Sequence, residues 1–392
     1  MDNITHSLVG ATLAELALPT SAPRAARRTF FAAGIIAANL PDADLVYTRI
    51  TPAPLGALLH HRGHTHTVVG LALLGVAMVA VCVIPRIRDT IGPLRGRLWT
   101  LIAVALASHL VLDSWNSYGV HPFWPIDSRW FYGDAVFILE PWIWLLLGVS
   151  VVANAMTMST RVLVGGALVG IVSLGAFFRQ IPVVAFFALL VVALVLAVTM
   201  RRRTRRARTG IALALTTLFV AGLFALREVA RGESLATLAP GARARLIDVV
   251  LSPQAANPLC WTVLTIARDE SGTSSVMTHG NVAVLTANGC GDGRADRVEW
   301  DTPHTQSIAE LRALSRRDCW VRGWLQFGRA PQIADGAISD VRYGTSPRGN
   351  FTTMILKPPS EAARCPANLT AWRPPRADLL GDAAEMQRNA SE

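Results

Sequence analysis

The chain has 392 residues, of which 52% are hydrophobic, and this composition indicates a membrane protein rather than a water-soluble one. Its net charge of +10 would suit a nucleic-acid-binding protein, but the distribution of charge argues against that class. Residues 1–226 contain 18 arginines and nine acidic residues, whereas residues 227–392 contain 19 basic and 18 acidic residues. The excess of basic residues therefore belongs to the apolar half, and we expect no nucleic-acid partner.

The first apolar segments are short and are separated by a basic turn. Residues 2–18 carry no basic n-region, which argues against a cleavable signal peptide and favours a tilted or interfacial helix. An apolar segment at 29–40 ends at Pro41. The stretch His60–Thr67 then places four histidines within seven residues, directly before the uncharged run 68–84, which is long enough to cross about 30 Å of hydrocarbon.

Further apolar spans follow a loop that contains four arginines. We expect them near the following residues: 98–115, 141–158, 162–178, 181–200 and 210–226. If the arginine run 201–208 is cytoplasmic, alternation places 14 arginines in cytoplasmic turns and four in the opposite turns. The sequence thus predicts a multi-pass membrane bundle of about six to eight helices, with the histidine cluster facing outward.

Residues 227–392 have a different pattern, in which short β-branched and aromatic runs alternate with Gly, Pro, Asn and Asp. Strands are predicted at the following runs: 245–251, 260–267, 276–286, 320–327 and 351–356. We therefore predict a transmembrane domain at 1–226, a periplasmic β-rich domain at 227–372 and a flexible tail at 373–392. Four of the five cysteines, Cys260, Cys290, Cys319 and Cys365, fall in this part and suit an oxidising compartment, although their three pairings stay open.

The residues with the chemistry of a metal site lie at the predicted outward ends of the helices. His109 and Asp113 share one face of an apolar helix, where an ionisable pair is costly unless it is paired, hydrated or metal-bound. An alternative is that the two side chains only pair with each other. Asp42 and Asp44 form a D-x-D pair that could offer carboxylate oxygens to a cation, or simply end a helix.

Together these residues predict a divalent-metal site. The expected ligands are His6, Asp42, Asp44, His61, His66, His109 and Asp113, with Asp134 and Glu140 as outer residues that could support them. Mixed imidazole and carboxylate ligands favour zinc, with manganese or magnesium as alternatives, and their number would allow one or two ions. The sequence contains no HExxH motif and no CxxC pair, which argues against zincin and thiolate sites.

These motifs resemble the YdjM-type family of bacterial inner-membrane metal-dependent hydrolases, also described as LexA-regulated. The resemblance rests on the segments Asp2–Gly10, Asn39–Asp44, His61–Thr67 and His109–Asp113, with further similarity at Trp124-Pro125 and 134–141. It covers residues 1–150 well and the C-terminal part loosely. Where the family tends to have Asp before the proline, this chain has Glu140. The resemblance implies a metal-dependent hydrolase.

The outward position of the site leads us to expect a lipid or lipid-linked (phospho)ester as the substrate. Arg62 is expected to bind an anionic group of the substrate, and His64 to carry a proton. An alternative function is a divalent-metal transporter or sensor, although its ionisable groups should then lie at successive depths of the membrane. A β-domain that is merely anchored for protein interaction would leave the His and Asp residues unexplained.

Overall fold

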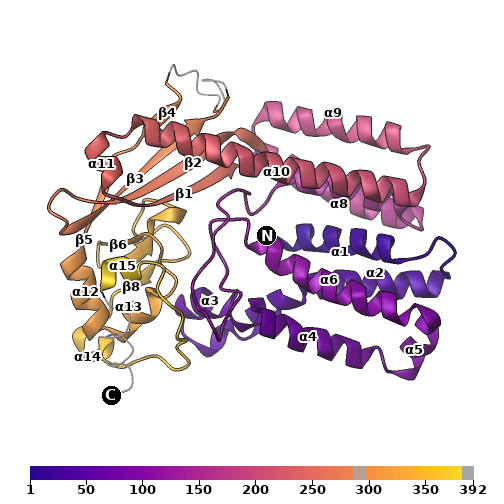
Figure 1. Cartoon of the computed structure of the whole chain (residues 1–392), viewed down its shortest axis with the longest axis horizontal. Helices are drawn as coiled ribbons and strands as arrows, with labels where there is room; N and C mark the ends of the chain where they lie inside the picture. Colours follow the sequence, from indigo (N-terminus) through magenta and orange to yellow (C-terminus); the bar gives the residue numbers. More distant parts are fainter. Residues whose placement is uncertain (286–289, 291–295, 382–392) are drawn as a thin grey trace.

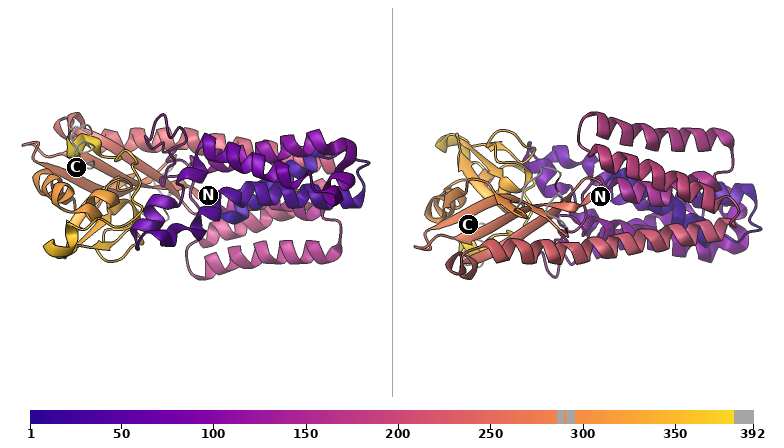
Figure 2. Two further views of the ribbon diagram at one scale, coloured as in Figure 1. Left: turned by 90° about the horizontal axis from the view of Figure 1, so that it is seen from below. Right: turned by 90° about the horizontal axis from the view of Figure 1, so that it is seen from above.

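The computed structural model describes residues 1–285, 290 and 296–381. A bundle of roughly parallel and antiparallel helices forms one part, and a β-rich domain covers one end of it (Figures 1 and 2). The principal helices of the bundle are α1 (Asn3–Ala17), α2 (Arg24–Asn39), α4 (Val68–Val81), α6 (Arg95–Asp113), α7 (Pro141–Asn154), α8 (Met158–Phe177), α9 (Val183–Met200) and α10 (Arg205–Thr237). This architecture confirms the predicted helical membrane part with a C-terminal β-rich domain.

Within the described residues, five helical stretches are long and apolar enough to cross a membrane. A sixth results if the short helix α3 (Leu55–His60) and the turn after it are counted with α4, from which they are bent by 66°. Helices α1 and α7 have 15 and 14 residues and complete the bundle as shorter elements. Helix α8 buries none of its residues in the protein, as expected for a helix surrounded by lipid.

Two glycines bring the first two helices close together. A Cβ atom added at Gly10 would lie 2.3 Å from the carbonyl oxygen of Gly34, and one added at Gly34 would lie 2.5 Å from that of Gly10. Only glycine allows this approach of the two backbones. The start of α1 and the end of α2 therefore lie side by side, and Asn3 donates hydrogen bonds to Asn39 (3.2 Å) and Asp42 (3.1 Å).

Short helical turns carry most of the polar residues at the ends of these helices. They include the 3-10 turns η1 (Leu40–Val46), η2 (Thr48–Ile50) and η3 (His64–His66), and the helix α5 (Pro85–Ile91). The turns η1 to η3 lie at the end of the bundle that the β-rich domain covers, whereas α5 lies at the opposite end (Figure 1).

The arginine-rich turns gather at the end of the bundle that lies away from the β-rich domain. Arg97 donates a hydrogen bond to the carbonyl of Ala17, and Arg206 donates to that of Leu18. Arg205 donates to the carbonyl of Asn154 at the end of α7. All four turns predicted to lie on one side of the membrane are thus at one end of the molecule.

The C-terminal domain contains two antiparallel sheets. The larger has the order β1-β2-β3-β4 with β5 also paired to β3, and the smaller has the order β6-β7-β8. The strands are β1 (Leu246–Gln254), β2 (Asn257–Arg268), β3 (Ser274–Ala283), β4 (Val298–Trp300), β5 (His304–Ser307), β6 (Pro331–Ala334), β7 (Ala337–Asp340) and β8 (Met354–Ile355). Disulfides join Cys260 to Cys290 and Cys319 to Cys365, which is one of the three pairings that the sequence leaves open.

Three details differ from the predictions. The predicted strand at 320–327 is wrong, because Asp318 accepts hydrogen bonds from the backbone of Trp320 and Val321 and so starts the helix α13 (Cys319–Trp324). The predicted domain boundary at 226 falls inside α10, whose C-terminal turns pack on the larger sheet.

The predicted tail from 373 onward is packed in part. Helix α15 (Ala377–Leu380) lies beside α12 (Ile308–Arg317), and Leu379 and Leu380 are buried. Residues 382–392 lie outside the described part of the chain. The domain therefore extends at least as far as Leu380.

Candidate metal centre

Histidine and aspartate side chains from separate elements meet at the end of the bundle beneath the β-rich domain. Potential ligand atoms of four residues lie within 4.8 Å of one another, and these are Asp42, His66, His109 and Asp113. A second group, formed by Asp42, Asp44 and His61, meets the same criterion. Because Asp42 belongs to both groups, the two form one continuous cluster with room for one or two ions.

The hydrogen bonds of two imidazoles point their free nitrogens at each other. His109 Nδ1 lies 2.6 Å from the carbonyl oxygen of Ala38 and donates to it. His66 Nδ1 lies 3.2 Å from Asp44 Oδ2. A neutral imidazole has one N–H, so each Nε2 then presents a lone pair, and the two Nε2 atoms are 2.9 Å apart.

Two lone pairs at that separation repel each other unless a metal ion or a proton lies between them. Asp42 Oδ1 is 3.4 Å from each of these nitrogens, and Asp113 Oδ2 is 3.2 Å from His66 Nε2 and 3.6 Å from His109 Nε2. Four donor atoms thus converge on one point, with the outer nitrogens oriented by a carbonyl and a carboxylate. This is the usual arrangement around metal-binding histidines, and the residues present fit a divalent ion.

Asp113 is the most heavily contacted carboxylate of the cluster. It is buried at the end of α6, and its oxygens lie 3.0 and 3.2 Å from nitrogens of the Arg62 guanidinium. His6 Nε2 is 3.3 Å from Asp113 Oδ1, and the His6 ring stacks on that of His109 with centroids 3.9 Å apart. The Met1 amino group also pairs with Asp113. Six of the seven predicted ligands thus belong to the two groups, whereas His6 belongs to neither and lies against Asp113 and His109.

Arg62 is held in place by contacts with two carboxylates of the cluster, Asp44 and Asp113. Its φ of 59° is in the left-handed region, which costs a non-glycine residue energy and needs compensating contacts. The Arg62 backbone N–H donates to Asp44 Oδ2 at 2.9 Å, and its guanidinium donates to the Asp113 carbonyl and to Asn116 Oδ1, both at 3.1 Å. The side chain is only 2% exposed. Its charge is therefore directed at Asp113 rather than at an open surface where a substrate anion would bind.

Four polar residues named from the sequence lie apart from the cluster. His60 bonds to Thr51 at 2.7 Å, and the exposed His64 packs its ring against two tryptophans. Asp134 forms two 2.9 Å hydrogen bonds with Arg329 of the β-rich domain. Glu140 is the N-cap of α7, and burial raises its pKa to about 8. Neither Asp134 nor Glu140 belongs to either group of potential ligands.

Several contacts of the site could not be found from the sequence. Tyr118 lies under the Arg62 guanidinium at 4.6 Å, and Asn116 accepts a hydrogen bond from it. Thr65 donates to Asp44 Oδ2 at 2.8 Å. Asn116 follows Asp113 by three residues at the end of an apolar helix, which is a weak signal. The sequence does not indicate that the Ala38 carbonyl accepts a hydrogen bond from His109, because every residue has a backbone carbonyl.

The cluster lies close to exposed aliphatic side chains. Of its side chains, His61 is 24% exposed and Asp42 is 9% exposed, whereas those of Asp44, His66, His109 and Asp113 are at most 1% exposed. The turn η1, which carries Asp42 and Asp44, also exposes Leu45 and Val46, and the next turn, η2, exposes Ile50. Asp42 thus shares a turn with an aliphatic surface.

Fold and site together define an integral membrane protein with a buried histidine–aspartate cluster at one end of a helical bundle. A family model described as "YdjM inner membrane protein" matches residues 1–182. The inner membrane protein YbcI of Escherichia coli K12 is 34% identical over 137 residues, which cover 29% of this chain and 75% of YbcI. The chain belongs to the YdjM family and is an inner membrane protein.

A second relative is longer than the region it shares with this chain. The uncharacterized protein YfhP of Bacillus subtilis strain 168 is 28% identical over 153 residues, which cover 37% of this chain and 43% of YfhP. The matching region thus spans less than half of that relative. No solved structure matches the chain.

Proposed function

We propose that this protein is a metal-dependent hydrolase that acts at the membrane surface on a lipid or a lipid-linked ester or phosphoester. The observation that carries the proposal is the pair of Nε2 atoms of His66 and His109, which face each other at 2.9 Å beside two carboxylates. Two such nitrogens need a metal ion or a shared proton between them, and with a metal ion the four residues supply a complete set of ligands.

The donor atoms suggest how ions would be held. His66, His109, Asp42 and Asp113 would bind one ion, and Asp42, Asp44 and His61 would bind a second. The mixture of nitrogen and oxygen favours zinc, with manganese or magnesium as the alternatives. A bound ion of this kind would lower the pKa of its water toward about 7 and polarise an ester oxygen.

The remaining residues orient these ligands. Arg62 fixes the Asp113 carboxylate, and Asp44 orients both His61 and His66 through hydrogen bonds to their Nδ1 atoms. His64 lies outside the cluster in the exposed turn η3, where it could exchange protons with solvent. The aliphatic surface at Leu45 and Val46 supports a lipid as the substrate.

A transporter is the weaker alternative. An ion in transit needs polar groups at successive depths of the membrane. Within the described residues, both groups of potential ligands lie at one end of the bundle. This placement favours chemistry at a surface over passage through the membrane.

We also propose that the end of the bundle with the metal cluster and the β-rich domain faces the periplasm. The arginine-rich turns lie at the opposite end, as the positive-inside rule requires of the cytoplasmic side. The two disulfides of the β-rich domain suit an oxidising compartment.

The proposal is tested by metal analysis of the purified protein and of two variants, His66→Ala and His109→Ala. Each variant should lose most of its bound metal, because one of about four ligands is missing. His60→Ala is the matched control, since His60 lies outside the cluster, and it should keep its metal. Full metal content in both cluster variants would refute the metal site.

Activity is tested separately on the metal-loaded protein with phospholipid and lipid-linked phosphoester substrates. Arg62→Lys should keep the metal but slow turnover, because an ammonium group cannot reproduce the two-point contact with Asp113. A protein that binds metal and hydrolyses none of these substrates would favour the transporter or sensor.

A further inference from the structure

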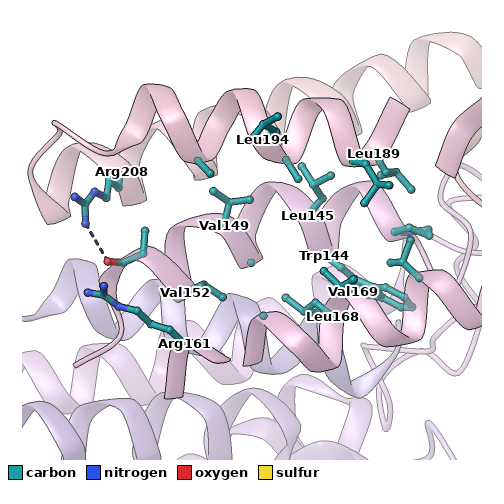
Figure 3. Close-up of a pocket in the computed structure, with 18 of the residues that line it drawn as sticks. Trp144, Leu145, Val149, Val152, Arg161, Leu168, Val169, Leu189, Leu194 and Arg208 are labelled. Carbon is teal, nitrogen blue, oxygen red and sulfur yellow. Dashed lines mark hydrogen bonds between the residues drawn. The ribbon is translucent and has the colours of Figure 1, made fainter. Parts of the chain in front are cut away.

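A second feature of the bundle lies away from the metal cluster. Helices α7, α8 and α9, with one residue of α10, enclose a cavity of about 630 Å³ that opens to the side of the bundle (Figure 3). Its walls are aliphatic and include Leu145, Val149, Leu168, Val169 and Leu194. Figure 2 shows α8 and α9 at the margin of the bundle, and α8 buries none of its residues in the protein, as expected of a lipid-facing helix.

One end of this cavity is strongly basic. Arg161, Arg201 and Arg208 line it there, as the close-up shows for Arg161 and Arg208 (Figure 3). Among the described residues, none of these three arginines forms an ion pair. The nearby carboxylate of Glu15 is already paired with Arg27 at 2.6 Å and with Arg205 at 3.9 Å. The cavity therefore ends in positive charge that the protein does not neutralise.

The length and lining of the cavity indicate its occupant. Along α8 its lining runs from Arg161 to Val172, which is about 16 Å of helix and close to the thickness of one leaflet, roughly 15 Å. A purely apolar occupant would leave the three arginines without an anionic partner. Long aliphatic walls that end in arginines instead match one apolar chain with an anionic head.

We propose that this cavity binds an anionic phospholipid of the leaflet at the arginine-rich end, with an acyl chain between α7, α8 and α9 and its phosphate at Arg161 and Arg201. Arg208 supports the head site from behind. Its guanidinium donates to the carbonyls of Ala153, Met200 and Arg201, so it holds the ends of α7 and α9 together. This lipid site is separate from the metal cluster, which lies at the other end of the bundle.

The test uses the full-length protein in a neutral detergent, with phosphatidylglycerol or phosphatidylcholine added and bound lipid counted by native mass spectrometry. Phosphatidylglycerol should bind more tightly. The double variant Arg161→Gln/Arg201→Gln should bind it about 30-fold more weakly, since each arginine is worth about fivefold near an anionic lipid. The matched control is Arg202→Gln/Arg203→Gln, which changes the same turn outside the cavity and should bind normally.

A second variant tests the apolar part of the site. Ala193 lines the cavity, and Ala193→Phe should fill it and prevent retention of the acyl chain. Metal content reports whether each variant is folded, because the cluster lies at the other end of the bundle. Equal binding of the two lipids, unchanged binding in the Arg161/Arg201 variant, or a dimer that retains no lipid would overturn the proposal.

Discussion

His121 provides a pH-dependent test of how the β-rich domain is attached. It lies in the connection between α6 and α7, and its ring packs against Trp130 (4.6 Å) and against Trp372 (4.1 Å) of the C-terminal domain. The side chain is fully buried, and neither ring nitrogen has a hydrogen-bond partner among the described residues. Burial, together with the nearby histidines His66 and His64, lowers the pKa of His121 to about 3.

The direction of the pH effect on stability depends on whether the folded or the unfolded state binds the proton more readily. Above pH 6.5 His121 is neutral in both the folded and unfolded states, so it contributes no pH dependence. As the pH falls below 6.5, His121 binds a proton in the unfolded chain, whereas in the folded protein it stays neutral until about pH 3. Stability is therefore lost on acidification, by about 2 kcal/mol between pH 7.5 and pH 5 for this one residue.

The matched variant is His121→Phe, which keeps an aromatic ring between the two tryptophans and removes the titration. The free energy of unfolding of both proteins is measured by denaturant titration in the same detergent at pH 7.5, 6.5 and 5.0. The two proteins share every other titrating group, so their difference isolates His121. On going from pH 7.5 to pH 5.0, the free energy of unfolding of the variant should rise by about 2 kcal/mol relative to that of the native protein. Parallel pH profiles would show that His121 is not held neutral at this contact.

Two further predictions concern the β-rich domain. Arg329→Gln should lower the stability of the domain contact by about 3–5 kcal/mol, because it leaves Asp134 buried without its partner and Asp248 with only Arg376, at 3.4 Å. Hydrogen exchange should rise in both segments, and unchanged exchange would refute this role of Arg329. A reporter fused after Arg206 should be cytoplasmic and one fused after Leu380 should be periplasmic. The cysteines of the two disulfides should resist alkylation until reductant is added, and these are Cys260, Cys290, Cys319 and Cys365. The reverse reporter result would contradict the proposed orientation.

The sequence predicts the location of the cluster better than its detailed geometry. Charge asymmetry and hydropathy place the ends of α2 and α6 and the turn η3 on one side of a membrane, and the structure brings them to one end of the bundle. Nothing local shows that His109 faces His66. That contact depends on the packing of α6 on α2, which brings His109 Nδ1 to the carbonyl of Ala38 and is a tertiary feature.

The expectations for Arg62 and Asp134 show a limit of motif reasoning. An arginine beside metal ligands has the same sequence signature whether it binds substrate or positions a carboxylate. The structure separates these roles, because the Arg62 guanidinium contacts Asp113 and the Arg62 side chain is only 2% exposed. Asp134 likewise precedes the next helix as an outer ligand would, yet its partner is Arg329, nearly 200 residues away in sequence. A long-range ion pair of this kind has no local pattern.

The division between family region and β-rich domain bears on how the site works. All the potential ligands lie within residues 1–182, the region that matches the family model, so whatever chemistry is common to the family must come from the helical bundle. The β-rich domain adds contacts to the loops that carry the ligands. Trp372 donates to the Leu59 carbonyl at 2.8 Å and Arg342 donates to the Ser117 carbonyl at 2.8 Å, on either side of the Arg62–Asp113 pair. The domain thus contacts the segments on either side of the cluster, and none of its described residues belongs to either group of potential ligands.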